Sequence, residues 1–443
     1  MKAEVIKGLI YDLECYEAHV KYDEDENVVR RESLLEHTER TVWYFEKIWK
    51  EKGLDEMLER FYLQMYGDLS EQAKNFWKEM ISGIFVFHDL GKINPDFQRK
   101  KLGNKRVKED NVFRFLAGRH SILSAVLYLD YFIAELQSTE IDIKEKKRLR
   151  RYLLYHAYII ERHHSDLDNF TRFIYVMEEE AGKDIIEIGK NGECLAWKRD
   201  FFLNENRFKL LKQKFDQQES ADKDGENGIR IYAYVKMLYS LLIASDYYAT
   251  AEFMSEIKMH AFGNLDEIQG WFDVYEQTKR MQETRVYQST EYPKMAEELH
   301  GASDINQLRR EMFCDAEKVL KQHTHENLFY LEAPTGSGKS NTAFNLSFQL
   351  MRMDSRLKKI FYIYPFNTLV EQNLRSLEDI FGNCPDIFNQ ITVVNSLVPV
   401  KMTEIKKKKE AEQECTSYYQ EALLDRQFLN YPMILSTHVS LFD

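Results

Sequence analysis

The chain has 443 residues, 44% of them hydrophobic and 13% aromatic, and a formal net charge of −12 at pH 7. This length and composition are typical of a globular protein with two or three domains, each able to bury its own core. No apolar run approaches the about 20 residues that span a bilayer, and acidic residues follow Met1 too closely for a signal peptide, so we expect a cytoplasmic protein with no membrane partner.

Three basic tracts stand out against the acidic balance: RKKLGNKRVK at 99–108, KEKKRLRR at 144–151 and KKKK at 406–409. A solvated helix face or loop explains any one tract by itself. The first two fall in the histidine-bearing half of the chain, where they become relevant if the substrate is a polynucleotide, because lysine and arginine bind backbone phosphates.

Residues 1–255 are predicted to form a mostly helical domain. Apolar segments without proline or glycine at 120–136 and 229–253 predict long helices. The polar, turn-forming stretch at 216–228 predicts a surface loop between them. Residues 256–310 carry weaker patterns and are expected to form a helical connector.

Within this domain the stretch FVFHDLGK at 85–92 places an aspartate directly after a run of large apolar residues. A buried carboxylate is costly unless a cation neutralises it. The stretch therefore predicts either a local salt bridge at a helix end or a metal site.

Seven of the twelve histidines fall in the first 164 residues: His19, His37, His88, His120, His156, His163 and His164. Any one of them alone is explained as a core or capping residue, and His156 is interpreted in that way. Imidazole and carboxylate together suit transition metals such as manganese, iron, cobalt, nickel or zinc. An adjacent pair such as His88-Asp89 can flank a centre of two metals, with the carboxylate bridging the ions.

The ordered set His37, His88-Asp89, His120, His163-His164 and Asp246 resembles that of the HD-domain metal-dependent phosphohydrolases, which have helical folds. The HDLGK stretch, followed by NPDFQ and HSILSA, is most similar to the nuclease domain of the CRISPR-associated helicase-nuclease of type I systems. The resemblance implies a two-metal site for phosphodiester hydrolysis, with single-stranded DNA as substrate and an RNA-guided surveillance complex (Cascade) as partner.

The same resemblance implies a role for each residue. One ion would be held by His37, His88, Asp89 and Asp246, and the other by Asp89, His120, His163 and His164. Asp89 would bridge the two ions. Lys92 matches the lysine of the family motif and is expected to act on a phosphate oxygen, unless it is a solvated turn residue.

Residues 311–443 are predicted to form an α/β domain. Short aromatic or β-branched runs at 327–333, 359–365, 391–396 and 433–438 alternate with helix-length segments, which is the pattern of a parallel sheet. The sequence LEAPTGSGKS at 331–340 lies between a predicted strand and a predicted helix, the context that a phosphate-binding P-loop requires. We expect the phosphates of ATP, with magnesium, to bind the loop residues Thr335, Gly336, Ser337, Gly338, Lys339 and Ser340.

Alanine at 333, where the strict P-loop pattern has glycine, resembles the loop of superfamily 2 helicases. The stretches at 363–373 and 434–443 are similar to helicase segments that contact the DNA backbone. No acidic box and no second RecA-like lobe follow, so we expect an incomplete helicase lobe with negligible ATP turnover.

The sequence thus predicts a multidomain protein, with an all-α HD-type nuclease domain followed by a partial RecA-like lobe. Two alternatives stay open. One is a phosphohydrolase of small nucleotides, such as a dNTPase, and the other is a DNA-binding or recruitment module with an inactive metal site.

Overall fold

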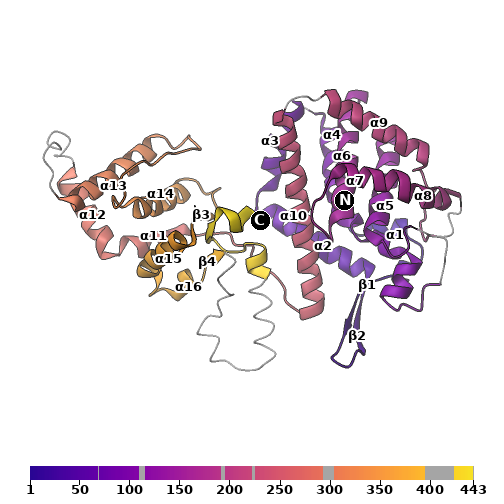
Figure 1. The fold of residues 1–443 in the computed structure, drawn as a ribbon, viewed down its shortest axis with the longest axis horizontal. Coiled ribbons are helices and arrows are strands. Elements are labelled where there is room, and N and C mark those ends of the chain that lie inside the picture. The colour runs from indigo at the N-terminus through magenta and orange to yellow at the C-terminus, as the bar shows by residue number, and fades with distance from the viewer. Residues whose placement is uncertain are drawn as a thin grey trace. The chain divides into compact units, whose positions relative to one another are not determined.

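The computed structural model describes residues 1–67, 69–108, 115–190, 195–221, 225–292, 304–394 and 424–442. The chain divides into two compact units, Met1–Lys258 and Met259–Asp443 (Figure 1). No described helix is long and apolar enough to cross a membrane. The basic tract at 406–409 and the end of the run at 391–396 lie outside the described residues.

The first unit is a helical bundle. Its helices are α1 (Val5–Leu9), α2 (Leu34–Glu51), α3 (Leu54–Tyr66), α4 (Glu71–Phe87), α5 (His120–Ser138), α6 (Ile143–Arg162), α7 (Phe170–Tyr175), α8 (Ala181–Lys190), α9 (Glu205–Ala221) and α10 (Gly225–Ser255). The helices predicted at 120–136 and 229–253 are confirmed as α5 and α10. Helix α5 packs against α6, and α10 packs against α2. Large side chains such as Phe85, Tyr128 and Tyr152 are fully buried between the helices.

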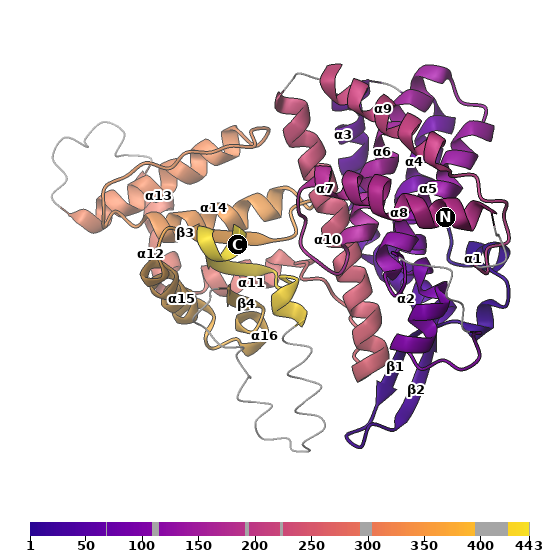
Figure 2. The same cartoon turned by 45° about the vertical axis from the view of Figure 1, so that its right-hand side comes forward.

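A two-stranded antiparallel hairpin precedes the bundle, and the sequence analysis did not predict it. Strand β1 (Glu17–Tyr22) pairs with β2 (Val28–Ser33), and the hairpin extends away from the helices (Figure 2). Ser33 ends β2 and also caps α2, because its side chain accepts a hydrogen bond from the backbone of Glu36 while the Glu36 side chain binds the backbone of Ser33. This capping box fixes where α2 begins, and with it the position of His37.

The second unit has an α/β core. Its elements are α11 (Ile268–Glu276), α12 (Lys279–Thr290), α13 (Ile305–Gln322), α14 (Lys339–Met353), β3 (Ile360–Tyr364), α15 (Asn367–Phe381), α16 (Pro385–Phe388), β4 (Ile391–Val394), β5 (Met433–Thr437) and α18 (His438–Phe442). The strands form a parallel sheet in the order β3-β5-β4, which confirms the predicted sheet type. Helices α11 to α15 contribute to one hydrophobic core with the sheet.

Two predicted elements are wrong. The loop expected at 216–228 is largely helical, because α9 continues to Ala221 and α10 begins at Gly225. Its glutamine, glutamate and lysine residues suit an exposed helix as well as a loop. The strand expected at 327–333 has no strand partner among the described residues, and Leu328 and Tyr330 are 90% and 88% exposed. An apolar run forms a strand only where a neighbouring strand completes its hydrogen bonds.

Candidate metal centre and nucleotide loop

The two adjacent pairs of candidate ligands lie where helices end. His88 caps the C-terminus of α4, and Asp89 follows with a φ of −110° as the chain enters a 3-10 turn over Leu90–Ile93. His163 caps the C-terminus of α6, and His164 follows it. Neighbours on a regular helix diverge by about 100°. Because the backbone leaves the helix at each pair, adjacent side chains can turn toward one cluster.

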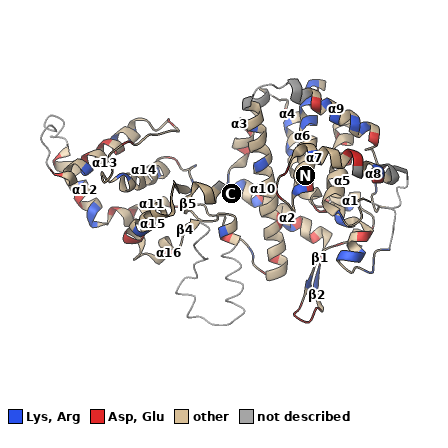
Figure 3. Cartoon of the chain, viewed as in Figure 1, with Lys and Arg blue, Asp and Glu red and all other residues tan. Residues whose placement is uncertain are grey.

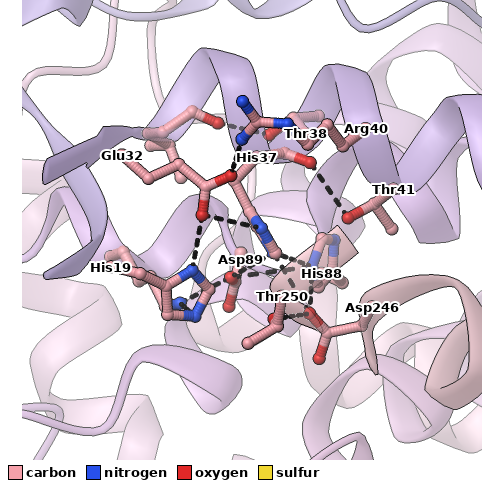
Figure 4. Close-up of polar contacts among 12 residues, drawn as sticks. His19, Glu32, His37, Thr38, Arg40, Thr41, His88, Asp89, Asp246 and Thr250 are labelled. Atoms are coloured by element: carbon pink, nitrogen blue, oxygen red, sulfur yellow. Dashed lines mark hydrogen bonds and ion pairs between the residues drawn. The ribbon is translucent and has the colours of Figure 1, made fainter. Parts of the chain in front are cut away.

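The first group consists of His37 from α2, His88, Asp89 and Asp246 from α10 (Figure 4). His37 Nε2 lies 3.1 Å from Asp246 Oδ1 and 3.2 Å from Asp89 Oδ2. His88 Nε2 lies 3.3 Å from His37 Nε2 and 3.6 Å from Asp89 Oδ2. The four potential ligand atoms lie within 4.8 Å of one another, which is compatible with ligands around a single metal ion.

The second group consists of Asp89, His120, His163 and His164. Asp89 Oδ1 lies 3.4 Å from His120 Nε2 and 3.5 Å from His163 Nε2. His120 Nε2 and His164 Nε2 are 2.8 Å apart. His120 is the first residue of α5, so its ring reaches the site from the helix N-terminus. The structure therefore brings all seven candidate metal ligands into two adjoining groups.

Asp89 belongs to both groups through different oxygens. Its Oδ2 faces His37 and His88, whereas its Oδ1 faces His120 and His163. Lys92 forms an ion pair with Oδ2 at 2.6 Å, and its own side chain is buried. A carboxylate placed in this way can bridge two cations.

Close packing of the turn after Asp89 holds this arrangement together. A Cβ atom at Gly91 would overlap the carbonyl oxygen of His120, and the Gly91 N–H donates to Ser124 Oγ on α5 at 2.8 Å. Glycine is therefore required where the turn meets α5. This contact brings Asp89 within reach of His120.

The backbone orients two of the rings. His88 Nδ1 hydrogen bonds to the carbonyl oxygen of Phe85 at 2.8 Å, and His163 Nδ1 to that of Ile160 at 2.6 Å. A carbonyl oxygen only accepts, so each Nδ1 carries the proton and donates it. The Nε2 atom is then left with the lone pair that binds a metal.

The pKa values agree with metal-ligating protonation states for most of the cluster. Burial raises the pKa of Asp89, but Lys92 and the surrounding histidines outweigh burial and hold it well below its usual value. Burial is the largest cause that lowers the pKa of His120 to about 4, so this ring is neutral near pH 7. His37 differs: burial lowers its pKa, but hydrogen bonds with Asp246, Asp89 and Glu32 raise it well above its usual value. A bound cation would take the place of that proton.

The residues present fit two divalent transition-metal ions. Asp89 Oδ2 has an ion pair with Lys92, but Asp89 Oδ1 and the buried Nε2 of His163 have no hydrogen-bond partner among the described residues. Buried polar atoms that lack partners and converge on one point are costly unless they bind something. Imidazole nitrogen and carboxylate oxygen are donors that manganese, iron, cobalt, nickel and zinc accept.

The two groups differ in their access to solvent. All four residues of the first group are buried, whereas in the second group His120 is partly exposed and His164 is exposed. Among the described residues, the second group is therefore the more solvent-accessible part of the centre.

His156, interpreted as a core residue, lies in the core. Its Nδ1 and Nε2 atoms are each 2.7 Å from a tyrosine hydroxyl, those of Tyr128 and Tyr234. His19 and Glu32, for which the sequence analysis gave no role, lie beside His37. Glu32 is one of several acids near the start of α2, so the sequence offered no signal to single it out.

The six predicted nucleotide-binding residues lie on one loop and the first turn of α14. Gly336 and Gly338 have φ angles of +82° and +90°, which favour glycine. The Lys339 ammonium donates to the carbonyl oxygens of Ala333 and Pro334, and Arg309 donates twice to the carbonyl oxygen of Gly336, at 2.8 and 2.6 Å. The turn and helix of a P-loop are therefore present, without the preceding strand.

Comparisons with known families divide the chain in the same order. A family model described as the HD domain of Cas3 matches residues 20–226, and one described as the res subunit of type III restriction enzymes matches residues 281–431. Asp246 lies beyond the first match, so its place in the cluster comes from the structure and not from this match. No curated protein and no solved structure matches the chain.

Proposed function

We propose that this chain hydrolyses phosphodiester bonds of single-stranded DNA at a centre of two divalent metal ions. The chain belongs to the CRISPR-associated family that joins a Cas3-type HD nuclease domain to a helicase-like region. The observation that carries the proposal is the position of Asp89, with one oxygen toward each histidine group. This arrangement supports a bridged pair of ions rather than two unrelated sites.

Each group would hold one ion. His37, His88 and Asp246 would hold the first, and His120, His163 and His164 the second, with Asp89 shared between them. When bound, such ions lower the pKa of a coordinated water and neutralise charge on the attacking and leaving oxygens of a phosphodiester. The Lys92 ammonium pairs with Asp89 Oδ2 and would keep this carboxylate ionised and oriented.

The exposed side of the centre suits a flexible strand. The 99–108 tract begins two residues after Phe97, whose ring lies 4.6 Å from that of His120, so the tract is near the exposed group. The tract at 144–151 begins at the opposite end of α6 from His163, about 28 Å away along the helix. Positive and negative side chains are otherwise interspersed on the helices (Figure 3). We therefore assign DNA backbone contacts near the centre to the first tract.

The helicase-like region is proposed to bind ATP, with Lys339 at the phosphates and Ser340 at magnesium. All seven metal ligands lie in the first unit, so cleavage of a strand that is already single should not require ATP. An RNA-guided surveillance complex would supply such a strand in the cytoplasm.

The test is cleavage of end-labelled single-stranded DNA with manganese, iron, cobalt, nickel or zinc, each with and without ATP. We expect cleavage by the wild type and by Lys339→Ala, and none by His88→Ala or Asp89→Ala. Lys339→Ala is the matched control, because it removes a charged residue from the other phosphate-binding site and leaves the metal ligands intact. A strict need for ATP would contradict the proposal.

Two rival functions are separated by the same preparation. A dNTPase-like enzyme would release phosphate from free nucleotides and leave the DNA strand uncut. An inactive recruitment module would bind DNA without cutting it under any of the metals. The complete set of ligands argues against the inactive module, and the helicase-like region argues against a nucleotide hydrolase.

A further inference from the structure

Glu32 is a buried acid beside the metal centre. It lies near the end of β2, directly opposite His19 on β1 and five residues before His37. Its side chain is only 1% exposed, and its two oxygens have different partners. Oε1 pairs with the Arg40 guanidinium, whereas Oε2 faces two histidines (Figure 4).

The first histidine is the candidate ligand His37. Its Nδ1 lies 3.4 Å from Glu32 Oε2, and this buried nitrogen has no well-directed hydrogen bond elsewhere among the described residues. The Arg40 guanidinium and the Nδ1–H of His19 both contact the Glu32 carboxylate and favour its ionised form. An ionised acceptor at this point favours the proton on Nδ1 of His37. With a proton held on Nδ1, the Nε2 atom, which lies beside Asp89 and Asp246, is the one that would bind the first ion.

The second histidine connects Glu32 to the bridging carboxylate. His19 Nδ1 donates to Glu32 Oε2 at 2.8 Å, and His19 Nε2 accepts from Lys92 Nζ at 3.2 Å. Lys92 in turn pairs with Asp89 Oδ2 at 2.6 Å. Glu32 is therefore linked both to a ligand of the first ion and, through His19 and Lys92, to the bridge.

We propose that Glu32 is a positioning residue of the metal centre, which orients His37 for the first ion and, through His19, holds Lys92 against Asp89. This inference rests on the proposed two-metal centre. The sequence around Glu32 gives no sign of the role, because the role depends on how β1 and β2 pair.

A third ion held by His19, Glu32 and His37 is the competing explanation, since their potential ligand atoms also lie close together. The charges argue against it. The Arg40 guanidinium already contacts one oxygen of Glu32, and the Lys92 ammonium contacts His19. Two cations at this point would repel a third.

The matched control is Glu17, a second buried carboxylate in the same hairpin. It is 2% exposed and pairs with Arg31 and Arg106, but it does not contact the histidines of the centre. Glu17→Gln and Glu32→Gln therefore remove the same charge from the same hairpin. Only Glu32→Gln removes it from His37 and His19.

The experiment measures binding of manganese to the full chain by electron paramagnetic resonance, and the visible absorption of bound cobalt. Loss of a residue that orients a metal-ligating histidine typically weakens metal binding about 10- to 100-fold. We expect a loss in that range, with a changed cobalt spectrum, for Glu32→Gln, a partial rescue for Glu32→Asp, and wild-type values for Glu17→Gln.

Wild-type metal affinity in Glu32→Gln, or equal losses in both glutamine variants, would overturn the positioning role while leaving the two-metal centre intact. Binding of three ions by the wild type, reduced to two in Glu32→Gln, would replace it with the third-ion explanation. Failure of the wild type to bind any of the metals would instead reject the proposed function itself, and the inference with it.

Discussion

Replacing Asp89 with alanine should remove both metal ions, whereas replacing Asp246 should remove one. The expectation follows from the two oxygens of Asp89, which face different histidine groups, while Asp246 contacts the two histidines of the first group, His37 and His88. We expect two bound ions per chain in the wild type, about one in Asp246→Ala and close to none in Asp89→Ala at the same free metal concentration. Nuclease activity should fall at least as far in Asp89→Ala as in any single histidine variant.

Asp89→Ala also affects folding, and this effect has to be separated from metal loss. The change leaves the buried Lys92 without a carboxylate partner, next to the neutral His19 ring, and breaking a buried ion pair in this way costs about 3–5 kcal/mol. The double variant Asp89→Ala/Lys92→Met removes the orphaned charge. It should regain most of the lost stability in the metal-free protein but none of the metal.

The assay is metal content by mass spectrometry after dialysis against a fixed metal buffer, with thermal unfolding of the same samples. One ion retained by the folded double variant would show that the two groups bind independently, and the bridging assignment would be wrong. Near-normal cleavage of single-stranded DNA by Asp89→Ala would reject the metal centre as the site of the reaction.

Three further predictions test other parts of the structure. Binding of a short single-stranded oligonucleotide should weaken with salt less steeply in Lys101→Ser/Lys105→Ser than in the wild type. The slope of log binding constant against log salt concentration should be smaller by about 1.4, since each phosphate contact contributes about 0.7. The control variant Lys144→Ser/Lys147→Ser should keep the wild-type slope. Gly91→Ala should weaken metal binding and destabilise the fold by about 1–3 kcal/mol because its Cβ overlaps the carbonyl oxygen of His120, while Gly8→Ala, which meets open space, should do neither. Burial raises the pKa of Glu317, but Lys321, Arg285 and Asn345 outweigh burial and hold it below its usual value of 4.5. The stability that the ionised carboxylate contributes is therefore present above pH 4.5 and is lost as pH falls through the lowered pKa. Glu317→Gln should therefore lower the unfolding temperature of the second unit at pH 7 and by less at pH 4, and an equal loss at both would contradict this reasoning.

The helices were predictable where burial leaves a continuous apolar signal. Helix α5 has eleven buried residues, and its apolar run marked it without ambiguity. Helix α9 was missed at its C-terminal end because only a narrow stripe that includes Phe208, Leu211 and Phe215 is buried. The sequence from 216 to 220 at this end is polar, and polar residues are compatible with both loops and exposed helices.

The strand at 327–333 shows a different limit of the sequence. Its composition is that of a buried strand, as for β3 and β5, but a strand also needs a partner on which to place its hydrogen bonds. Partners lie far away in sequence, so no local pattern reports them. The hairpin of β1 and β2 was missed for a different reason: its strands are close in sequence, but β2 is largely exposed and rich in charged residues, so no apolar run marks it. The relation of His19 to Glu32 depends on this pairing and could not be foreseen.

The candidate ligands could be proposed from the sequence because their order along the chain resembles that of the HD-domain phosphohydrolases. The structure explains why two adjacent pairs can contribute to one cluster. A pair on a continuous helix would point in two directions, but His88-Asp89 and His163-His164 stand where α4 and α6 end. Both residues of the first pair are buried. Of the second pair, His163 is buried and His164 is exposed. The helix ends thus build a centre with a closed side, formed by His37, His88 and Asp246, and an open side at His120 and His164. A closed site favours tight retention of an ion, and an open one leaves room for a phosphate to approach. The proposed nuclease needs both properties, one from each group.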